Sequence, residues 1–310
     1  MTLDESSRWP SLNYDVWSAT CDTLHAHTQV LGKLAASLAP PEPQLQHAAL
    51  RLSARGWETA SLPAPNKSGT FVVSLDLRTH EAVIEHSDGR SRRVPLTPNR
   101  AVADVTREVL EATAALVGPV RINPAPQEVP WKTPLDEDHE HRSYDTAQVT
   151  TYFAIATRAA RALAEVRAPY RGRSSPVNAW WGSFDLAISL FSGRAVDPPS
   201  NGFIARNAAN AEQIELGWWP GDTRYSRAAF FAYAFPAPEG FAGAVVSPSR
   251  ARWDPNLGEY LFDWDDVIAS RAPLEAAVEF GRSVIAHACA VCNWDPVLAS
   301  SAQGEIPPVT

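Results

Sequence analysis

Hydrophobic residues recur with the period of an α-helix in four long stretches of the chain. In residues 14–38 apolar side chains lie three and four positions apart, and the Pro40-Pro41 pair ends the pattern. The same spacing predicts three further helices, over residues 101–117, 146–167 and 273–292. Asp145, just before the third helix, is a residue type that commonly caps a helix N-terminus.

Strand patterns, in which apolar residues alternate with others, fill the stretches between these helices. In the first part of the chain they predict strands over residues 47–57, 70–77, 83–84 and 93–96, a turn at 87–89 and a brief strand at 121–122. After a proline-rich link at 124–134 and the third helix, they predict strands over 176–192, AAFFAYAFP and 257–264. The glycines and proline of GWWPG predict a tight turn that presents two tryptophans.

The order helix, several strands, helix therefore occurs twice. We expect an α+β fold of two related helix–antiparallel sheet–helix halves, residues 1–130 and 131–310, packed into one unit with a cleft between them. A single integrated domain is the alternative. Each half would leave one sheet face uncovered, and pairing with its copy would bury that face. About a pseudo-twofold axis, the strand at 47–57 would match residues 177–191, and His47 would face the site as Asn178 does.

The segment SSPVNAWWGSFDLAISLFSG, residues 174–193, combines a strand pattern with two tryptophans and an acid. One face of the strand would carry Phe184, Leu186, Ile188 and Leu190. Asp185 falls on the opposite face, and an acid in so apolar a run must be paired, hydrogen-bonded or exposed to a cleft. Two interpretations follow: the polar outer face of an antiparallel sheet, or a tryptophan-lined pocket with one carboxylate pointing into it.

Composition and charge narrow the class of partner. The net charge is −8, from 27 Lys and Arg against 35 Asp and Glu, and no basic run offsets it, which argues against a nucleic-acid binder. No apolar run could span a bilayer, the N-terminus lacks a secretory pattern, and 3 cysteines are too few for a disulfide framework. We expect a cytoplasmic protein with a small-molecule substrate and with neither a membrane nor a nucleic-acid partner. The oligomeric state stays open.

Five stretches of the chain resemble one known family. They are WPSLNYDVWSATCDTLHAHTQVLGK, HEHRSYD, SSPVNAWWGSFDLAISLFSGR, GWWPG and FFAYAFPAPEGF, and the resemblance extends from Trp9 to about Asp295. Together they resemble the bacterial domain-of-unknown-function family 5996. The resemblance implies a single structural unit and no particular activity.

The same resemblance implies a set of shared histidines and carboxylates. These are His25, His141, Asp185 and Glu212. Such a set would suit a divalent metal, but two further family histidines are replaced here, by Asn178 and Ala211. Either the family site holds no metal, or this chain has given up the metal and uses the pocket otherwise. We favour the second interpretation, so no cofactor is favoured and a divalent metal is the alternative.

The candidate catalytic residues are those same four, His25, His141, Asp185 and Glu212. His25 can converge with Thr28 and Gln29 on one side of the first helix, and a neutral imidazole exchanges protons at about pH 7. A structural histidine bonded to a backbone carbonyl is the alternative. Glu212 and Glu215 would face the same way in a helix and opposite ways in a strand. The candidate substrate-binding residues are Trp180, Trp181, Trp218, Asn178, Gln29 and Arg55.

Three functions are compatible with these residues. The first is an enzyme that acts on a small, aromatic or anionic organic molecule in a tryptophan-lined pocket by histidine and carboxylate acid–base chemistry. Arg55 would hold an anionic group unless it forms a surface ion pair, and isomerisation, cyclisation, elimination and hydrolysis are all open. The second is a non-catalytic protein that binds a hydrophobic ligand or partner. The third is a divalent-metal enzyme with His25, His141, Asp185 and Glu212 as ligands.

Overall fold

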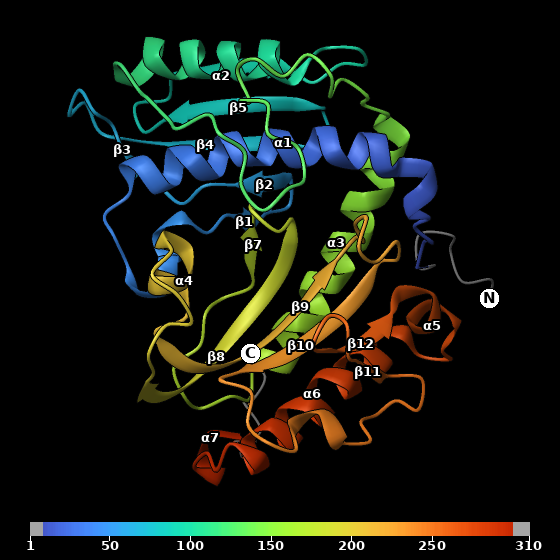
Figure 1. Ribbon diagram of the computed structural model, residues 1–310. Coiled ribbons are helices and arrows are strands. Elements are labelled where there is room, and N and C mark those ends of the chain that lie inside the picture. Colours follow the sequence, from blue (N-terminus) through green and yellow to red (C-terminus); the bar gives the residue numbers. More distant parts are fainter. Residues whose placement is uncertain (1–8, 300–310) are drawn as a thin grey trace, which may run out of the picture.

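In the computed structural model, which describes residues 9–299, the chain forms helices and two antiparallel β-sheets (Figure 1). The elements up to residue 117 are α1 (Tyr14–Leu38), the 3₁₀ helix η2 (Pro43–Ala48), β1 (Arg51–Leu52), β2 (Gly56–Glu58), β3 (Leu62–Pro63), β4 (Thr70–Asp76), β5 (Glu81–His86), β6 (Ser91–Pro95) and α2 (Val102–Val117). Those after residue 145 are α3 (Thr146–Arg167), β7 (Asn178–Trp180), β8 (Asp185–Ala195), α4 (Phe203–Ala208), β9 (Ala211–Trp219), β10 (Ala229–Phe235), η3 (Phe241–Gly243), β11 (Arg252–Asp254), β12 (Glu259–Asp263), α5 (Trp264–Ala269), α6 (Pro273–Val291) and α7 (Pro296–Ala299).

The α+β class predicted from the sequence is confirmed. The four predicted long helices are also confirmed, as α1, α2, α3 and α6. The Asp145 side chain caps α3 as expected, because it accepts hydrogen bonds from the backbone N–H groups of Ala147 and Gln148 at 2.9 and 3.0 Å. The division into two related halves stays a prediction, and its two ends, residues 1–8 and 300–310, lie outside the described residues.

Strands that are neighbours in the chain are mostly neighbours in the sheets. The first sheet has the order β1-β2-β4-β5-β6, with β3 also paired to β4, and the second has the order β7-β8-β9-β10-β12-β11. The two sheets are joined where Leu50 and Ala179 exchange backbone hydrogen bonds of 3.1 and 2.9 Å. This pair connects the same two segments that the predicted pseudo-twofold axis would relate.

Helices cover one face of the second sheet and leave the other open to a cavity. α1 and α2 pack on the first sheet, whereas α3 and α6 pack on the second (Figure 1). On β8, Leu186, Ile188 and Leu190 are fully buried in the core cluster that includes these helices. Asp185 lies on the opposite face, as the alternation predicted. Within residues 9–299 no helix has both the length and the apolar character that crossing a membrane requires.

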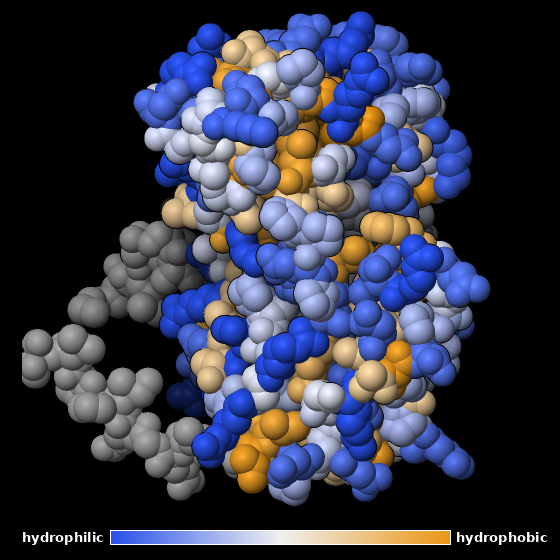
Figure 2. Space-filling view, turned by 90° about the vertical axis from the view of Figure 1, so that its left-hand side faces the viewer, coloured by the Kyte–Doolittle hydropathy of each residue, from blue (hydrophilic) through white to orange (hydrophobic). Residues whose placement is uncertain are grey.

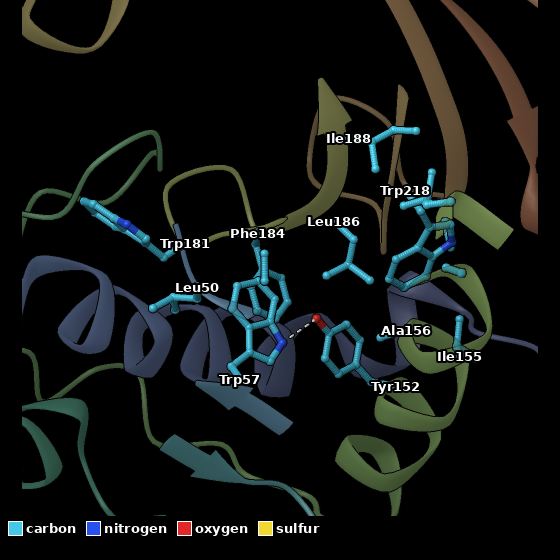
Figure 3. Close-up of a cluster of buried hydrophobic side chains, with 14 of the residues drawn as sticks. Leu50, Trp57, Tyr152, Ile155, Ala156, Trp181, Phe184, Leu186, Ile188 and Trp218 are labelled. Carbon is cyan, nitrogen blue, oxygen red and sulfur yellow. Dashed lines mark hydrogen bonds between the residues drawn. The ribbon is translucent and has the colours of Figure 1, made fainter. Parts of the chain in front are cut away.

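Aromatic rings fill the junction between the two sheets (Figure 3). The Phe184 ring stacks against His25, Trp57 and Tyr152, with centroid distances of 4.9, 5.2 and 5.3 Å. The Trp57 Nε1–H donates to the Tyr152 hydroxyl at 3.2 Å, so these two polar groups are paired within the apolar junction. A single hydrophobic cluster therefore extends across both sheets.

Two predicted long strands are wrong, because a turn divides each of them. Residues 47–57 complete η2 and then form the β1–β2 hairpin, in which Ser53 and Gly56 exchange backbone hydrogen bonds and Gly56 has φ 148°. Residues 176–192 form β7 and β8, and the turn closes with a hydrogen bond of 2.8 Å from the Phe184 N–H to the Trp180 carbonyl. Phe184 adopts the left-handed conformation, with φ 60°, which reverses the chain inside an apolar run.

Two shorter predictions are also wrong. Residues 121–122 form no strand. The two tryptophans of GWWPG belong to β9 and not to a turn, since the strand continues to Trp219 and ends only at Pro220. Adjacent strand residues point to opposite faces, so Trp218 and Trp219 enter different environments.

Replacing Phe184 with alanine should lower the free energy of unfolding by about 3–5 kcal/mol, because the ring is 3% exposed and fills the junction between the sheets. Phe203→Ala is the matched control: its ring is 61% exposed, and the expected change is within about 0.5 kcal/mol. Denaturant unfolding followed by tryptophan fluorescence measures both. Equal losses in the two variants would contradict the account of the junction.

Candidate functional site

A cavity of about 480 Å³ lies against the face of the second sheet that the helices leave open. Strands β8, β9 and β10 supply its floor, while α1, η2, α4 and the loop around Gln127 supply its walls. On the side of the molecule where α4 lies, hydrophobic residues reach the surface in separate groups among hydrophilic ones (Figure 2). The cavity is large enough for a small organic molecule.

A row of polar side chains crosses the floor from strand to strand. Glu215 on β9 lies in register with Ser189 on β8 and with Tyr233 on β10. Glu259, at the start of β12, also lines the cavity. Burial raises the pKa of Glu215 to about 8, although a hydrogen bond from Ser189 opposes the shift. Burial likewise raises the pKa of Glu259 to about 7, against the opposing charge of Arg224.

Asp185 supplies a second buried carboxyl at the first position of β8. Its side chain is 6% exposed and accepts a hydrogen bond from the Ser183 hydroxyl. Burial raises the pKa of Asp185 to about 7; the Ser183 bond opposes this, and the nearby charges of Glu128 and Glu259 add to it. The Glu128 carboxyl, whose pKa burial also raises, packs over Gly182, where a Cβ would lie 2.1 Å from its Oε2.

Aromatic rings form much of the remaining wall. Trp180, Trp181 and Trp219 all line the cavity, and Trp219 packs edge-on against Phe231 at a centroid distance of 5.3 Å. Trp181 is held on α1, because a Cβ at Gly32 would lie 2.0 Å from its Cγ, so only glycine allows this contact. The Trp181 Nε1–H donates to the Ala48 carbonyl at 3.0 Å, which fixes the ring from its other edge.

Two cationic side chains line the cavity, and each has a partner. The Lys33 ammonium donates to the Ala125 carbonyl at 2.7 Å and lies 5.4 Å from the centre of the Trp181 ring, while burial lowers its pKa to about 8. Arg224 forms an ion pair of 2.7 Å with Asp222. Each therefore has a partner of its own, although the charge of Arg224 still opposes the rise in the pKa of Glu259 and of Glu128.

The structure gives His25 a positioning role. It is not part of the cavity wall, and its Nε2 lies 3.0 Å from the carbonyl oxygens of both Trp181 and Gly182. Because both partners are acceptors, Nε2 must carry the proton. Burial lowers the pKa of His25 to about 4, so the ring is neutral at physiological pH. The geometry thus favours the structural alternative for this histidine over a proton shuttle.

Gln29, predicted to bind substrate, instead holds the loop that carries Glu128. Its Nε2 donates to the Gln127 carbonyl at 3.0 Å, and its Oε1 accepts from the Gln127 N–H at 2.9 Å. Both partners are backbone groups, so the amide acts as a clamp between α1 and the loop. Gln29 does not line the cavity.

Glu212 and His141 also lie away from the cavity. A strand places residues 212 and 215 on opposite faces, so Glu212 points away from the cavity. It is bonded there to Ser192 and to Arg194. His141 pairs with Asp138 at 2.7 Å. Glu215, which the sequence analysis does not assign to the site, lines the cavity where Glu212 was predicted.

Some of the remaining predicted substrate-binding residues line the cavity, and the others lie elsewhere in the structure. Trp180 and Trp181 line the cavity, as does His47 from η2. Trp218 is fully buried in the core, and Trp219 takes its place in the cavity wall. Two further predicted residues have structural partners outside the cavity: Asn178 bonds to Arg51 and Gln46, and Arg55 pairs with Glu85 at 2.8 Å.

The four residues predicted as ligands if a metal is bound do not form a metal site. His25 is bonded to two carbonyls, His141 to Asp138 and Glu212 to Arg194, so Asp185 is left without them. Across residues 9–299 no group of three or more His, Cys, Asp or Glu side chains is arranged to hold a metal ion. The donor geometry thus does not fit the predicted ligand set.

Comparison with known proteins places this architecture in a family. A family model, described as a family of unknown function (DUF5996), matches residues 9–300. The chain belongs to this DUF5996 family. Neither the curated proteins nor the solved structures gave a match. Membership in the DUF5996 family confirms the resemblance seen in the sequence and carries no activity with it.

Replacing Glu215 with glutamine should stabilise the protein at high pH, because the raised pKa means that the fold disfavours the ionised carboxylate. The folded-state value of about 8 exceeds the ordinary 4.5, so the wild-type protein loses stability as the pH rises from about 4.5 to about 8. Below this window both side chains are neutral. The gain of Glu215→Gln over wild type should be on the order of 2 kcal/mol at about pH 9 and near zero at about pH 4.

Urea unfolding at these two pH values measures the difference, and Glu212→Gln, on the same strand but outside the cavity, is the control. A Glu215→Gln variant that is less stable than wild type at both pH values would contradict the assigned burial of the charge.

Proposed function

We propose that the chain is an enzyme that performs acid–base chemistry on a small organic molecule held in the cavity, with Asp185 and Glu215 as the carboxyls that transfer protons. The observation that carries the proposal is that both carboxyls face one cavity, are more than nine-tenths buried, and have a pKa raised to about 7 and about 8. Structural carboxylates are usually paired with cations, which lowers their pKa, whereas acid–base groups need a pKa near the working pH.

The spacing of the two carboxyls supports a division of labour between them. Asp185 and Ser189 are four residues apart on β8, about 13 Å along the strand, and Glu215 lies beside Ser189. Ala187 and Gly217 lie between them, and the Phe231 ring packs over Gly217, where a Cβ would lie 2.3 Å from its Cζ, so a substrate that reaches both carboxyls would lie against this ring. Glu215 has the higher pKa and is the general acid in this proposal, while Asp185 is the base.

The compartment forms part of the same proposal. Cys21, Cys289 and Cys292 are unpaired and buried, which is compatible with a reducing cytoplasm. Isomerisation, cyclisation, elimination and hydrolysis all need such acid–base groups, so the reaction class stays open.

A non-catalytic binding protein is the second candidate, because the aromatic wall offers a large apolar contact area. Trp180, Trp181, Trp219 and Phe231 would bind a flat or apolar ligand without any proton transfer. In that case the carboxyls would contribute to ligand selection alone.

The decisive experiment first identifies a ligand and then tests turnover. A metabolite library is screened by the change in tryptophan fluorescence, and each hit is incubated with protein and analysed by mass spectrometry. Asp185→Asn and Glu215→Gln should each reduce conversion by about 10²–10⁴-fold, the contribution usual for a general acid or base. Glu212→Gln should retain wild-type turnover, since Glu212 lies outside the cavity.

Full turnover by both cavity variants would refute the assignment of the acid and the base. Tight binding of a ligand that the wild-type protein never converts would instead favour the binding protein.

A further inference from the structure

We propose that the molecule bound in the cavity is an organic cation, with an ammonium group directed at the buried carboxyls and an apolar or aromatic body against the tryptophans. This inference rests on the same site as the proposed function, but it concerns recognition and does not require catalysis. It departs from the expectation, drawn from the sequence, of an aromatic or anionic substrate.

The charges around the cavity favour a positive ligand. Four carboxyls line it, those of Glu128, Asp185, Glu215 and Glu259. The cationic groups are Lys33 and Arg224, whose partners are the Ala125 carbonyl and Asp222. The other titratable groups that face the space are His47 and Tyr233. A ligand ammonium would therefore meet an excess of acidic groups that can ionise to pair with it, whereas a ligand carboxylate would find no such pairing with them.

The aromatic wall favours the same ligand. Ring faces attract cations through their quadrupoles, and the attraction increases where water is excluded. The cavity already contains one example, because the Lys33 ammonium lies 5.4 Å from the centre of the Trp181 ring. Four other rings face the same space: Trp180, Trp219, Phe231 and Tyr233. Aromatic rings together with carboxylates form the arrangement by which proteins recognise ammonium groups.

An amide in the cavity wall can add to the recognition of an ammonium group. Gln213 lines the cavity beside Glu215, and its side chain is 7% exposed. Its carbonyl oxygen can accept a hydrogen bond from an ammonium N–H, which would complete the coordination that the carboxylates begin.

Three probes of one shape and different charge test the inference. They are 2-phenylethylammonium, 2-phenylethanol and phenylacetate, each titrated into the full-length protein and followed by tryptophan fluorescence and calorimetry. The ammonium should bind at least about tenfold more tightly than the alcohol, and phenylacetate should bind most weakly. Phenylacetate binding as tightly as the ammonium would overturn the inference, and so would failure of the ammonium to bind at millimolar concentration.

The pH dependence gives a second readout. An ammonium binds the ionised carboxylates, so binding should release protons and its affinity should rise by about tenfold or more between about pH 6 and about pH 8.5. Proton release appears as a binding heat that depends on the ionisation enthalpy of the buffer. The affinity for 2-phenylethanol should change little over this range. An ammonium affinity that stays constant or falls with pH would contradict the inference.

Matched variants separate this inference from the proposed function. Asp185→Asn and Glu215→Gln should weaken binding of the ammonium about tenfold or more and leave binding of the alcohol unchanged, and Glu212→Gln should change neither. If these two variants lose their preference for the ammonium but still turn over a natural substrate, Asp185 and Glu215 are not the general base and acid. Equal binding of all three probes by the wild-type protein, with turnover still lost in the two variants, would remove only the cationic substrate class.

Discussion

The turn between β7 and β8 is fixed by contacts with α1, and the site depends on it. His25 donates to the carbonyls of Trp181 and Gly182, and the Trp181 ring lies directly on Gly32. Phe184 turns back into the junction between the sheets, with a left-handed backbone. Asp185 is the next residue along the chain. The first helix thus sets the direction of a carboxyl that belongs to the second sheet.

Burial of α1 explains why its polar residues carry so much of this arrangement. From Thr23 to Ala35 every side chain of the helix is buried, and His25, Gln29 and Lys33 find their partners inside the protein. His25 bonds to the turn, Gln29 to the loop at Gln127, and Lys33 to the Ala125 carbonyl. One helix therefore holds two segments beside the cavity, the β7–β8 turn and the loop at residues 125–127. The carboxyls within the cavity oppose folding at neutral pH, and the continuous aromatic core offsets that cost.

The sequence predicted the helices well because their evidence is local. The helical spacing of apolar residues, the Pro40-Pro41 pair after α1 and the Asp145 cap of α3 are enough to place α1, α2, α3 and α6. Strands were placed less well, since Phe184 breaks an apolar alternation with a backbone conformation that no spacing rule predicts for phenylalanine. On β9 the alternation of the strand decides which residues line the cavity, and these are Trp219 and Glu215, where the sequence predicts Trp218 and Glu212.

Other members of the site could not be found from the sequence at all. Glu128 comes from a loop whose position depends on the Gln29 clamp, and Lys33 lies on a helix where a lysine ordinarily faces solvent. The sequence predicts Asp185, because burying an acid in an apolar strand is costly and therefore indicates a special environment. That argument does not require knowing which residues surround it. The sequence predicts His25 as a site residue, but its role as a donor to two carbonyls depends on contacts with a turn far away in the chain.

The most direct test of the account is a pH titration of the Asp185 and Glu215 carboxyl carbons by ¹³C NMR. The account predicts that Asp185 titrates with a midpoint of about 7 and Glu215 with a midpoint of about 8. Midpoints of about 4 for both groups, the range of solvated carboxyls, would contradict the claim that the cavity holds buried acids able to exchange protons at neutral pH.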